Sequence, residues 1–182
     1  MNTVEPIRDQ YILKCIAEDL KKISMRNYMI FMCGLYTGRR ISDVLSFKVS
    51  DLKNRDSIFV RETKTKKKIL LPIHKELKKE LQEYLRDMQS HEYIFQTNRK
   101  DAKPMHRSTF YKILNKVSKK YGLERIGCHT MRKTFGYYYY QEFHDLATLQ
   151  DIFGHSDISV TKRYIGCIQD TINNTMKNFK LF

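Results

Sequence analysis

One stretch, "MRNYMIFMCGLYTG" at residues 25–38, is apolar around nearly the whole circumference of a helix. Ser24 before it is a suitable N-cap, and Gly38 at its end belongs to the residue type that most often stops helices. A helix that is apolar on all sides must be enclosed by other elements, so this one predicts the centre of a core. At 182 residues the chain has the length for one compact domain around that helix. No internal repeat or interdomain linker is evident, and residues 1–182 are expected to form a single domain.

The rest of the chain follows helical spacing with one change of period. Two β-rich runs, "SIFVRETK" and "KKILLPI", flank a charged turn and predict an antiparallel hairpin at residues 57–73. The polar segment at residues 91–107 predicts a loop. Further helices are predicted at residues 6–20, 41–47, 74–88, 108–120, 128–143, 146–153 and 157–165. In this interpretation Pro6 lies in a first helical turn and Ser108 is an N-cap. The expected fold class is mainly α with a small antiparallel β-sheet (α+β).

Charge is the most informative feature of the composition. The chain has 34 Lys and Arg against 20 Asp and Glu, a formal net charge of +14. This excess predicts attraction to a polyanion through phosphate contacts, and nucleic acid is favoured over an anionic membrane surface. No apolar run approaches the roughly 18–20 residues that span a bilayer, and "MNTVEPIRDQ" lacks a signal-peptide core. A cytoplasmic protein with no membrane partner is therefore expected.

Three separated segments combine chemically capable side chains with turn signals. "TGRRISD" places a pair of arginines between a helix-ending glycine and another helix. "CHTMRKTF" places His129 and Arg132 three residues apart, which is one face of a helix. "FGHSDISVTKRYIG" places His155 just before a capped helix that contains Tyr164. Each segment alone is also typical of a solvated turn or a helix boundary, so only their combination indicates a catalytic site.

In this order the three segments resemble the boxes of the tyrosine recombinase family, also called phage integrases. The catalytic domain of that family carries a first box with arginine, an HxxR box, and a GH box followed nine residues later by the nucleophilic tyrosine. Here His155 and Tyr164 are nine residues apart, and Arg40, directly before "ISD", aligns with the family arginine. The resemblance extends from about Ile7 to Phe179 and implies the tyrosine recombinase/integrase catalytic-domain fold.

The resemblance also implies a set of catalytic residues. The family places a lysine in the strand-turn region after the first arginine, which is Lys64 here, with Lys66 as the alternative. Tyr164 is the implied nucleophile. The complete implied set is Arg40, Lys64, His129, Arg132, His155 and Tyr164. No cofactor and no metal are expected, and no carboxylate cluster suitable for Mg²⁺ accompanies the boxes.

Elementary chemistry agrees with these roles. In-line attack by a tyrosine on a phosphodiester adds charge to the nonbridging oxygens, which Arg40 and Arg132 can bind with permanently protonated donors. A 5′-hydroxyl leaves poorly as an alkoxide, so a lysine such as Lys64 suits the general acid. The two histidines can accept the phenol proton or hydrogen-bond the phosphate. Tyr164 would then hold a 3′-phosphate covalently until a second 5′-hydroxyl reverses the step.

Other residues near the boxes have more ordinary expectations. Asp43 is expected to orient an arginine or to cap a helix rather than to bind metal. The run Tyr137 to Tyr140 lacks the box context of a nucleophile, and at most two of its members are expected to face the core. Contacts to DNA phosphates, which position a duplex without reading its sequence, are predicted for Arg39, Lys66, Lys67, Lys103, Arg107 and Lys133.

The sequence departs from the family pattern in a few places. Arg39 stands where the first box commonly has an apolar residue, and Met131 and Lys133 stand where the second commonly has leucine and histidine. The family's N-terminal helical domain has no counterpart before the first expected helix. We therefore expect either a catalytic half cut from a longer protein or a naturally short member, like the fimbrial phase-switch recombinases of similar size.

The expected function is site-specific cleavage and rejoining of double-stranded DNA through a covalent 3′-phosphotyrosyl intermediate, as in recombination of mobile elements. A homotetramer on paired sites is expected, with a monomer in isolation. Residues 167–182 are expected to be either an exchange element docked on a neighbouring protomer or a helix packed on its own domain. Two alternatives stay open: relaxation of supercoils as by a type IB topoisomerase, and DNA binding by a non-catalytic regulator on the same fold.

Overall fold

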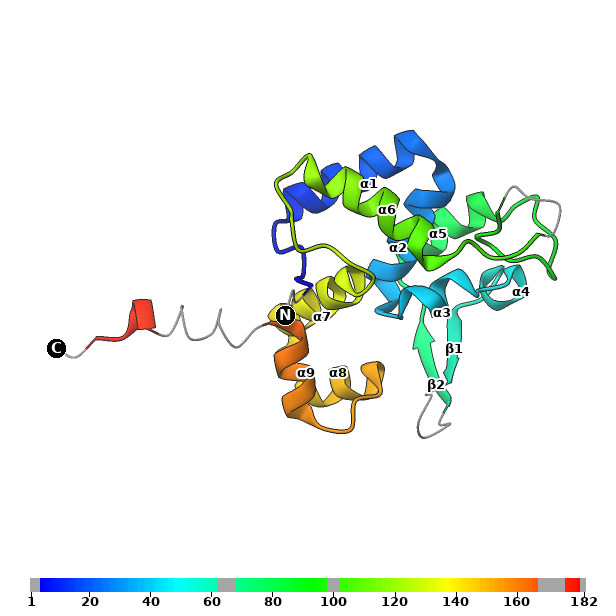
Figure 1. The fold of residues 1–182 in the computed structure, drawn as a ribbon. Coiled ribbons are helices and arrows are strands. Elements are labelled where there is room, and N and C mark those ends of the chain that lie inside the picture. The colour runs from blue at the N-terminus through cyan, green and yellow to red at the C-terminus, as the bar shows by residue number, and fades with distance from the viewer. Residues whose placement is uncertain (1–3, 62–67, 98–101, 167–175, 181–182) are drawn as a thin grey trace.

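Helix α2 (Met25–Thr37) lies at the centre of the fold, as its apolar sequence predicts (Figure 1). The computed structural model describes residues 4–61, 68–97, 102–166 and 176–180. Met29, Ile30, Phe31 and Cys33 of α2 have no exposed surface. The helices packed against α2 include α1 (Gln10–Ile23), α3 (Ile41–Leu45), α5 (Lys75–Tyr84) and α7 (Thr130–Phe143).

Both ends of α2 are set by the residues that the sequence indicates. The hydroxyl of Ser24 accepts a hydrogen bond from the backbone N–H of Arg26. Gly38 ends the helix in the left-handed conformation at φ +61°. The ring of Phe135 lies against Gly38 where a β-carbon would stand, so a larger residue there would be both strained and crowded. The chain therefore turns at Gly38 directly into the arginine pair of the first box.

The first helix begins later than the sequence predicts. Its first residue is Gln10 because the carboxylate of Asp9 accepts hydrogen bonds from the backbone N–H groups of the next turn. Residues 4–8, called the N-terminal segment below, are irregular. Within this segment Ile7 is buried, and its backbone N–H donates to the hydroxyl of Thr134 at 2.9 Å. The predicted start at Pro6 was wrong because these residues pack on α7 instead of continuing the helix.

The predicted hairpin is confirmed. Strands β1 (Ser57–Arg61) and β2 (Lys68–Pro72) pair antiparallel, with Ile58 opposite Leu71. The short helix α4 (Val49–Leu52), which precedes the hairpin, was not predicted from the sequence. Figure 1 shows the hairpin extending from the helical body.

The irregular segment before α6 (Arg107–Lys119) also agrees with the predicted loop, but the cap of that helix differs. His106 is the N-cap, and its Nδ1 accepts from the backbone N–H of Ser108 at 3.3 Å. The prediction of Ser108 as the cap was wrong because the helix begins at Arg107, one residue earlier, and the ring of His106 accepts the hydrogen bond from its first turn.

Helices α8 (Leu146–Phe153) and α9 (Ile158–Ile165) form a small second core with α7. The fully buried residues of this core are Leu149, Phe153 and Ile165. Gly136 permits the close approach, because a β-carbon there would lie 2.6 Å from Ile165 Cγ2 and 2.8 Å from Phe153 Cζ. In Figure 1 the α8–α9 pair and the hairpin extend on the same side of the body.

The four consecutive tyrosines lie on α7. Tyr137, Tyr139 and Tyr140 pack against the second core, and the hydroxyl of Tyr138 donates to the backbone oxygen of Arg8 at 2.7 Å. The prediction that at most two face a core was too low, because three of the four pack against the second core. The run serves as packing around the box residues.

Candidate active site

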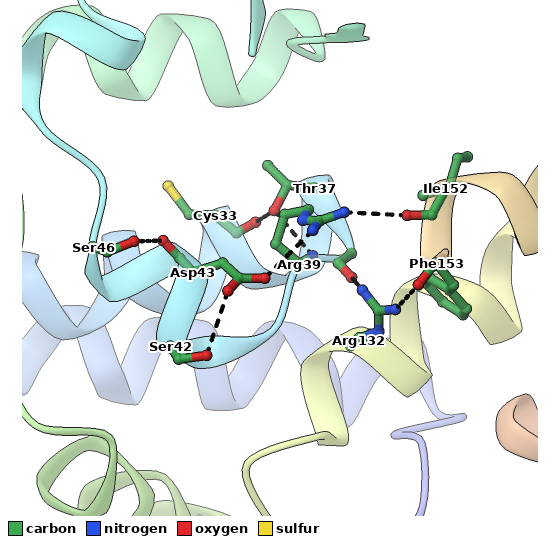
Figure 2. Close-up of polar contacts among 10 residues, drawn as sticks. Cys33, Thr37, Arg39, Ser42, Asp43, Ser46, Arg132, Ile152 and Phe153 are labelled. Carbon is green, nitrogen blue, oxygen red and sulfur yellow. Dashed lines mark hydrogen bonds and ion pairs between the residues drawn. The ribbon is translucent and has the colours of Figure 1, made fainter. Parts of the chain in front are cut away.

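Arg132, on α7, connects the three boxes. Its side chain is only 2% exposed. One terminal nitrogen donates to the backbone oxygen of Gly38 at 2.9 Å and the other to that of Phe153 at 2.6 Å (Figure 2). The guanidinium carbon also lies 4.2 Å from the centre of the Phe153 ring. Burial is the main cause that lowers the pKa of Arg132 to about 10. The charges of Arg40 and Arg39 lower the pKa further, and Tyr164 acts in the opposite direction. The guanidinium therefore stays protonated at neutral pH.

Arg39 is a second buried arginine at the same junction, with 6% of its surface exposed. It donates to the backbone oxygen of Ile152 at 3.2 Å and pairs with the carboxylate of Asp43 at 3.4 Å (Figure 2). Arg39 and Arg132 thus bind the last two carbonyls of α8, where the helix dipole favours cations. The expectation that Asp43 orients an arginine is confirmed for Arg39. A DNA contact by Arg39 stays a prediction, and the structure gives its side chain an internal role that the sequence did not indicate.

Tyr164, on α9, lies between the two histidines of the boxes. Its hydroxyl is 3.0 Å from Nδ1 of His129, and the two rings meet edge to face. The ring of His155 lies 5.2 Å from that of Tyr164, measured between centroids. Burial raises the pKa of the Tyr164 phenol, while the charges of Arg132 and Arg40 and a hydrogen bond from Arg132 act in the opposite direction. The hydroxyl is therefore sheltered from water yet surrounded by groups that stabilise its anion.

His155 follows the left-handed Gly154 that ends α8, and its Nδ1 lies 2.9 Å from the hydroxyl of Thr161. Burial, reinforced by the charges of Arg132 and Arg40, lowers the pKa of His155 to about 4. The imidazole is therefore neutral at physiological pH.

His129 is in the same electrostatic environment. Although its ring is partly exposed, shielding from water is the largest cause that lowers its pKa, followed by the charges of Arg132 and Arg40. A neutral ring has one nitrogen free to accept a proton. When His129 carries its proton on Nε2, the nitrogen facing Tyr164 is that acceptor.

Arg40 is half-buried at the N-cap position of α3. Its charge lowers the pKa of Arg132 and of both histidines, which places it within electrostatic reach of all of them. Arg107, exposed at the start of α6, also lowers the pKa of His129. Of the predicted catalytic set, the structure brings together Arg40, His129, Arg132, His155 and Tyr164.

The remaining predicted residues lie elsewhere. Lys64, Lys66 and Lys67 fall outside the described residues, as does most of the segment 167–182. Lys103 is exposed in the segment before α6. Lys133 is half-buried beside Tyr164, and its ammonium donates to the backbone oxygen of Val4 at 2.8 Å.

Three residues with a part in the site were not found from the sequence. Phe153 packs on both Arg132 and Tyr164, Thr161 orients His155, and Gly136 lets α7 approach α9. Only Gly136 gave a signal, since a lone glycine among large aromatic residues indicates close helix packing. The other two act through contacts between distant segments.

Within the described part of the chain, no group of three or more His, Cys, Asp or Glu side chains is placed to hold a metal ion. None of the helices described there combines the length and the apolar character needed to cross a bilayer.

A mainly helical domain that gathers two arginines, two histidines and a half-buried tyrosine is typical of enzymes that cleave and rejoin DNA strands. The family model described as the phage integrase family matches residues 9–167, and the chain belongs to this family of tyrosine recombinases.

Curated relatives agree with this assignment. The chain is 42% identical over 179 residues to a probable integrase/recombinase, YoeC, of Bacillus subtilis strain 168, covering 98% of each protein. It is 30% identical over 151 residues to the tyrosine recombinase XerD of Oceanobacillus iheyensis, covering 79% of this chain and 50% of that protein. The chain thus spans nearly all of one relative and half of the other. Recombination is favoured over both alternatives that the sequence left open.

Solved structures share the fold. The XerA recombinase superimposes with a TM-score of 0.77 at 22% identity, over 99% of this chain and 66% of that one. The XerH site-specific recombinase, in a post-cleavage complex with a palindromic difH substrate, superimposes with a TM-score of 0.75 at 20% identity. The match covers 97% of this chain and 54% of that one. A λ integrase dimer bound to a COC′ core site superimposes with a TM-score of 0.68 at 19% identity. The match covers 91% of this chain and 48% of that one.

Proposed function

We propose that this chain carries out site-specific DNA recombination with Tyr164 as the nucleophile. The observation that supports this role best is the contact of the Tyr164 hydroxyl with Nδ1 of His129, 3.0 Å away, beside the buried cation of Arg132. The relatives and neighbours given above bear the names of recombinases or integrases, and two of the three neighbours, XerH and λ integrase, were solved on DNA.

The first chemical step is transfer of the phenol proton. His129 accepts it through Nδ1, because its lowered pKa keeps the ring neutral before the reaction. Tyr164 Oη then attacks phosphorus, and the bond from phosphorus to the 5′-oxygen breaks. The product is a 3′-phosphotyrosyl bond, and a free 5′-hydroxyl remains on the other strand end.

Charge on the phosphorane is balanced by cations. Arg132 already has both terminal nitrogens bonded to backbone oxygens, which fixes the plane of its guanidinium before DNA arrives. Arg40 is the second clamp, since its charge reaches the same histidines. His155, neutral and held by Thr161, is a hydrogen-bond donor for a nonbridging oxygen. Lys64 is proposed as the acid that protonates the leaving 5′-oxygen.

The proposed assembly is a homotetramer on paired duplex sites, with a monomer in the absence of DNA. Residues 1–182 would act as one catalytic domain, and residues 167–182 would couple neighbouring protomers. Phosphate contacts outside the catalytic centre are assigned to Lys66, Lys67, Lys103 and Arg107, whereas Arg39 and Lys133, for which the sequence predicts the same role, bind backbone oxygens of the protein. The exposed position of Arg107 beside the site supports its place in this group.

Recombination can be separated from simple relaxation on a supercoiled plasmid that carries two copies of a binding site. The site is first recovered by binding selection from random duplexes. We expect deletion or inversion of the intervening DNA, together with a protein–DNA complex of tetramer mass in sedimentation. Relaxation without exchange would support topoisomerase-like activity instead, and binding without either product would support the regulator.

A further inference from the structure

We propose that Lys133 is a positioning residue for Tyr164: its ammonium binds the face of the tyrosine ring and favours the phenolate over the phenol. This inference rests on the proposed role of Tyr164 as the nucleophile.

The geometry places the lysine against the ring and not in open solvent. Lys133 follows Arg132 on α7 and is half-buried. Its ammonium nitrogen lies 5.1 Å from the centre of the Tyr164 ring, within the range of cation–π attraction. The same nitrogen donates to the backbone oxygen of Val4 at 2.8 Å. A protein carbonyl therefore replaces part of the hydration that would otherwise hold this cation in water.

The carbonyl that holds Lys133 is itself held in place. Val4 packs on Gly127 so closely that a β-carbon at that glycine would lie 2.6 Å from Val4 Cγ2. The next residue, Glu5, donates its backbone N–H to the backbone oxygen of Arg125 at 2.9 Å. The backbone N–H of Ile7 is bonded to α7 through Thr134, as described above. The N-terminal segment is thus held at Val4 and at the residues that follow it, and its Val4 carbonyl holds the lysine.

Other charges act on this pair, and the effect of Lys133 must be separated from theirs. Those facing Tyr164 are Arg132 and Arg40, with His129 and His155 as its titratable neighbours. Those facing Lys133 are Glu5 and Arg8. Burial is the main cause that lowers the pKa of Lys133. Arg8 lowers this pKa further, and Glu5 acts in the opposite direction. As long as Lys133 is protonated, its ammonium favours the negatively charged form of the ring that it contacts, so removing that charge is expected to raise the pKa of Tyr164.

The size of the effect follows from the distance. The negative charge of a phenolate is shared between the ring and its oxygen, and the ammonium lies 5.1 Å from the ring centre. Unit charges at about that separation, with water-like screening, shift a pKa by roughly half a unit. A phosphate contact, the role expected from the sequence, would leave the phenol unchanged in the DNA-free protein. The two roles therefore differ in a quantity that is measurable without DNA.

The experiment places 3-fluorotyrosine at position 164 of the full chain and follows its ¹⁹F chemical shift against pH without DNA. Lys133→Gln keeps an N–H donor for Val4 but removes the charge, and Lys133→Arg keeps the charge. Lys53→Gln is the matched control, because the ammonium of Lys53 also donates to backbone oxygens, at 2.9 and 3.0 Å, but at the end of α4.

We expect Lys133→Gln to raise the titration midpoint by at least about half a pH unit, with Lys133→Arg and Lys53→Gln staying near the parent protein. A midpoint for Lys133→Gln equal to that of Lys53→Gln would overturn the proposal. Covalent trapping on nicked DNA at neutral pH gives a second readout, in which Lys133→Gln should be slower by roughly three- to tenfold. If Tyr164→Phe still traps DNA, the proposed nucleophile is wrong. If Tyr164→Phe is inactive but Lys133→Gln leaves the titration midpoint unshifted, only the proposed role of Lys133 is wrong.

Discussion

The hydroxyl of Tyr164 lies 3.0 Å from Nδ1 of His129, although 35 residues separate them in the chain. The contact exists because α9 packs back on α7 across Gly136, and because Arg39 and Arg132 hold the carboxyl end of α8, which precedes α9. Position relative to these groups, not abundance, distinguishes Tyr164 among the twelve tyrosines of the chain.

Gly136→Ala should impair catalysis more than folding. The new methyl group would contact Ile165 and Phe153 at 2.6–2.8 Å, and relief requires α9 to move away from α7. Overpacking of this kind costs roughly 1–3 kcal/mol. Gly34→Ala is the matched control, because its nearest obstacle is the flexible thioether of Met131 at 2.6 Å. Covalent trapping rates and urea unfolding of both variants check this, and equal losses of trapping would contradict it.

Arg39→Leu tests whether Arg39 acts inside the protein or on DNA. Losing its bonds to Ile152 and Asp43 should lower the free energy of unfolding by about 1–3 kcal/mol. The dependence of DNA affinity on salt should hardly change if the side chain touches no phosphate. Arg107→Leu should show the reverse pattern, with little loss of stability and a salt slope reduced by about one. A reduced salt slope for Arg39→Leu would assign it to the DNA surface.

The pH dependence of stability should contain a contribution from His155. Its folded pKa of about 4 lies below the value of roughly 6.5 expected in the unfolded chain, so the unfolded state binds more protons between these values. This contribution to stability is fully present above pH ~6.5 and is lost as the pH falls toward 4. Thermal unfolding across this interval should therefore be less pH-dependent for His155→Asn than for the parent. An identical pH slope in the two proteins would count against a neutral, half-buried His155.

Tyr138→Phe should leave covalent complex formation intact. Burial raises the pKa of Tyr138 to about 12, and its hydroxyl is bonded to the backbone oxygen of Arg8. It is a packing residue whose loss costs one hydrogen bond, about 1 kcal/mol of stability. Urea unfolding and trapping on nicked DNA check both parts of this expectation.

Much of the fold was predictable because local signals and the global fold agree. The apolar helix between Ser24 and Gly38, the hairpin and the last helices were all found from periodicity and caps. The errors arose where an unforeseen side chain capped a helix: Asp9 begins the first helix after the predicted start at Pro6, and His106 takes the place of the predicted cap Ser108. Helix boundaries depend on single hydrogen bonds, which periodicity does not specify.

The site was predictable to a different degree. The resemblance of the three segments to the family boxes predicted Arg40, Arg132 and Tyr164, and the structure brings these residues together. The burial of Arg39 could not be foreseen, because an arginine after a helix-ending glycine is ordinarily solvated. The contact of Lys133 with Val4 and Tyr164 joins three distant segments, and no pattern in one sequence encodes it.

The most direct test of the central claim is covalent trapping on a nicked suicide duplex, resolved in a denaturing gel. Tyr164→Phe, Tyr138→Phe and Tyr139→Phe are compared with the parent protein. We expect the parent and the two control variants to yield a protein–DNA adduct and Tyr164→Phe to yield none. An adduct from Tyr164→Phe, or none from the parent on a site that it binds, would contradict the assignment of Tyr164 as the nucleophile.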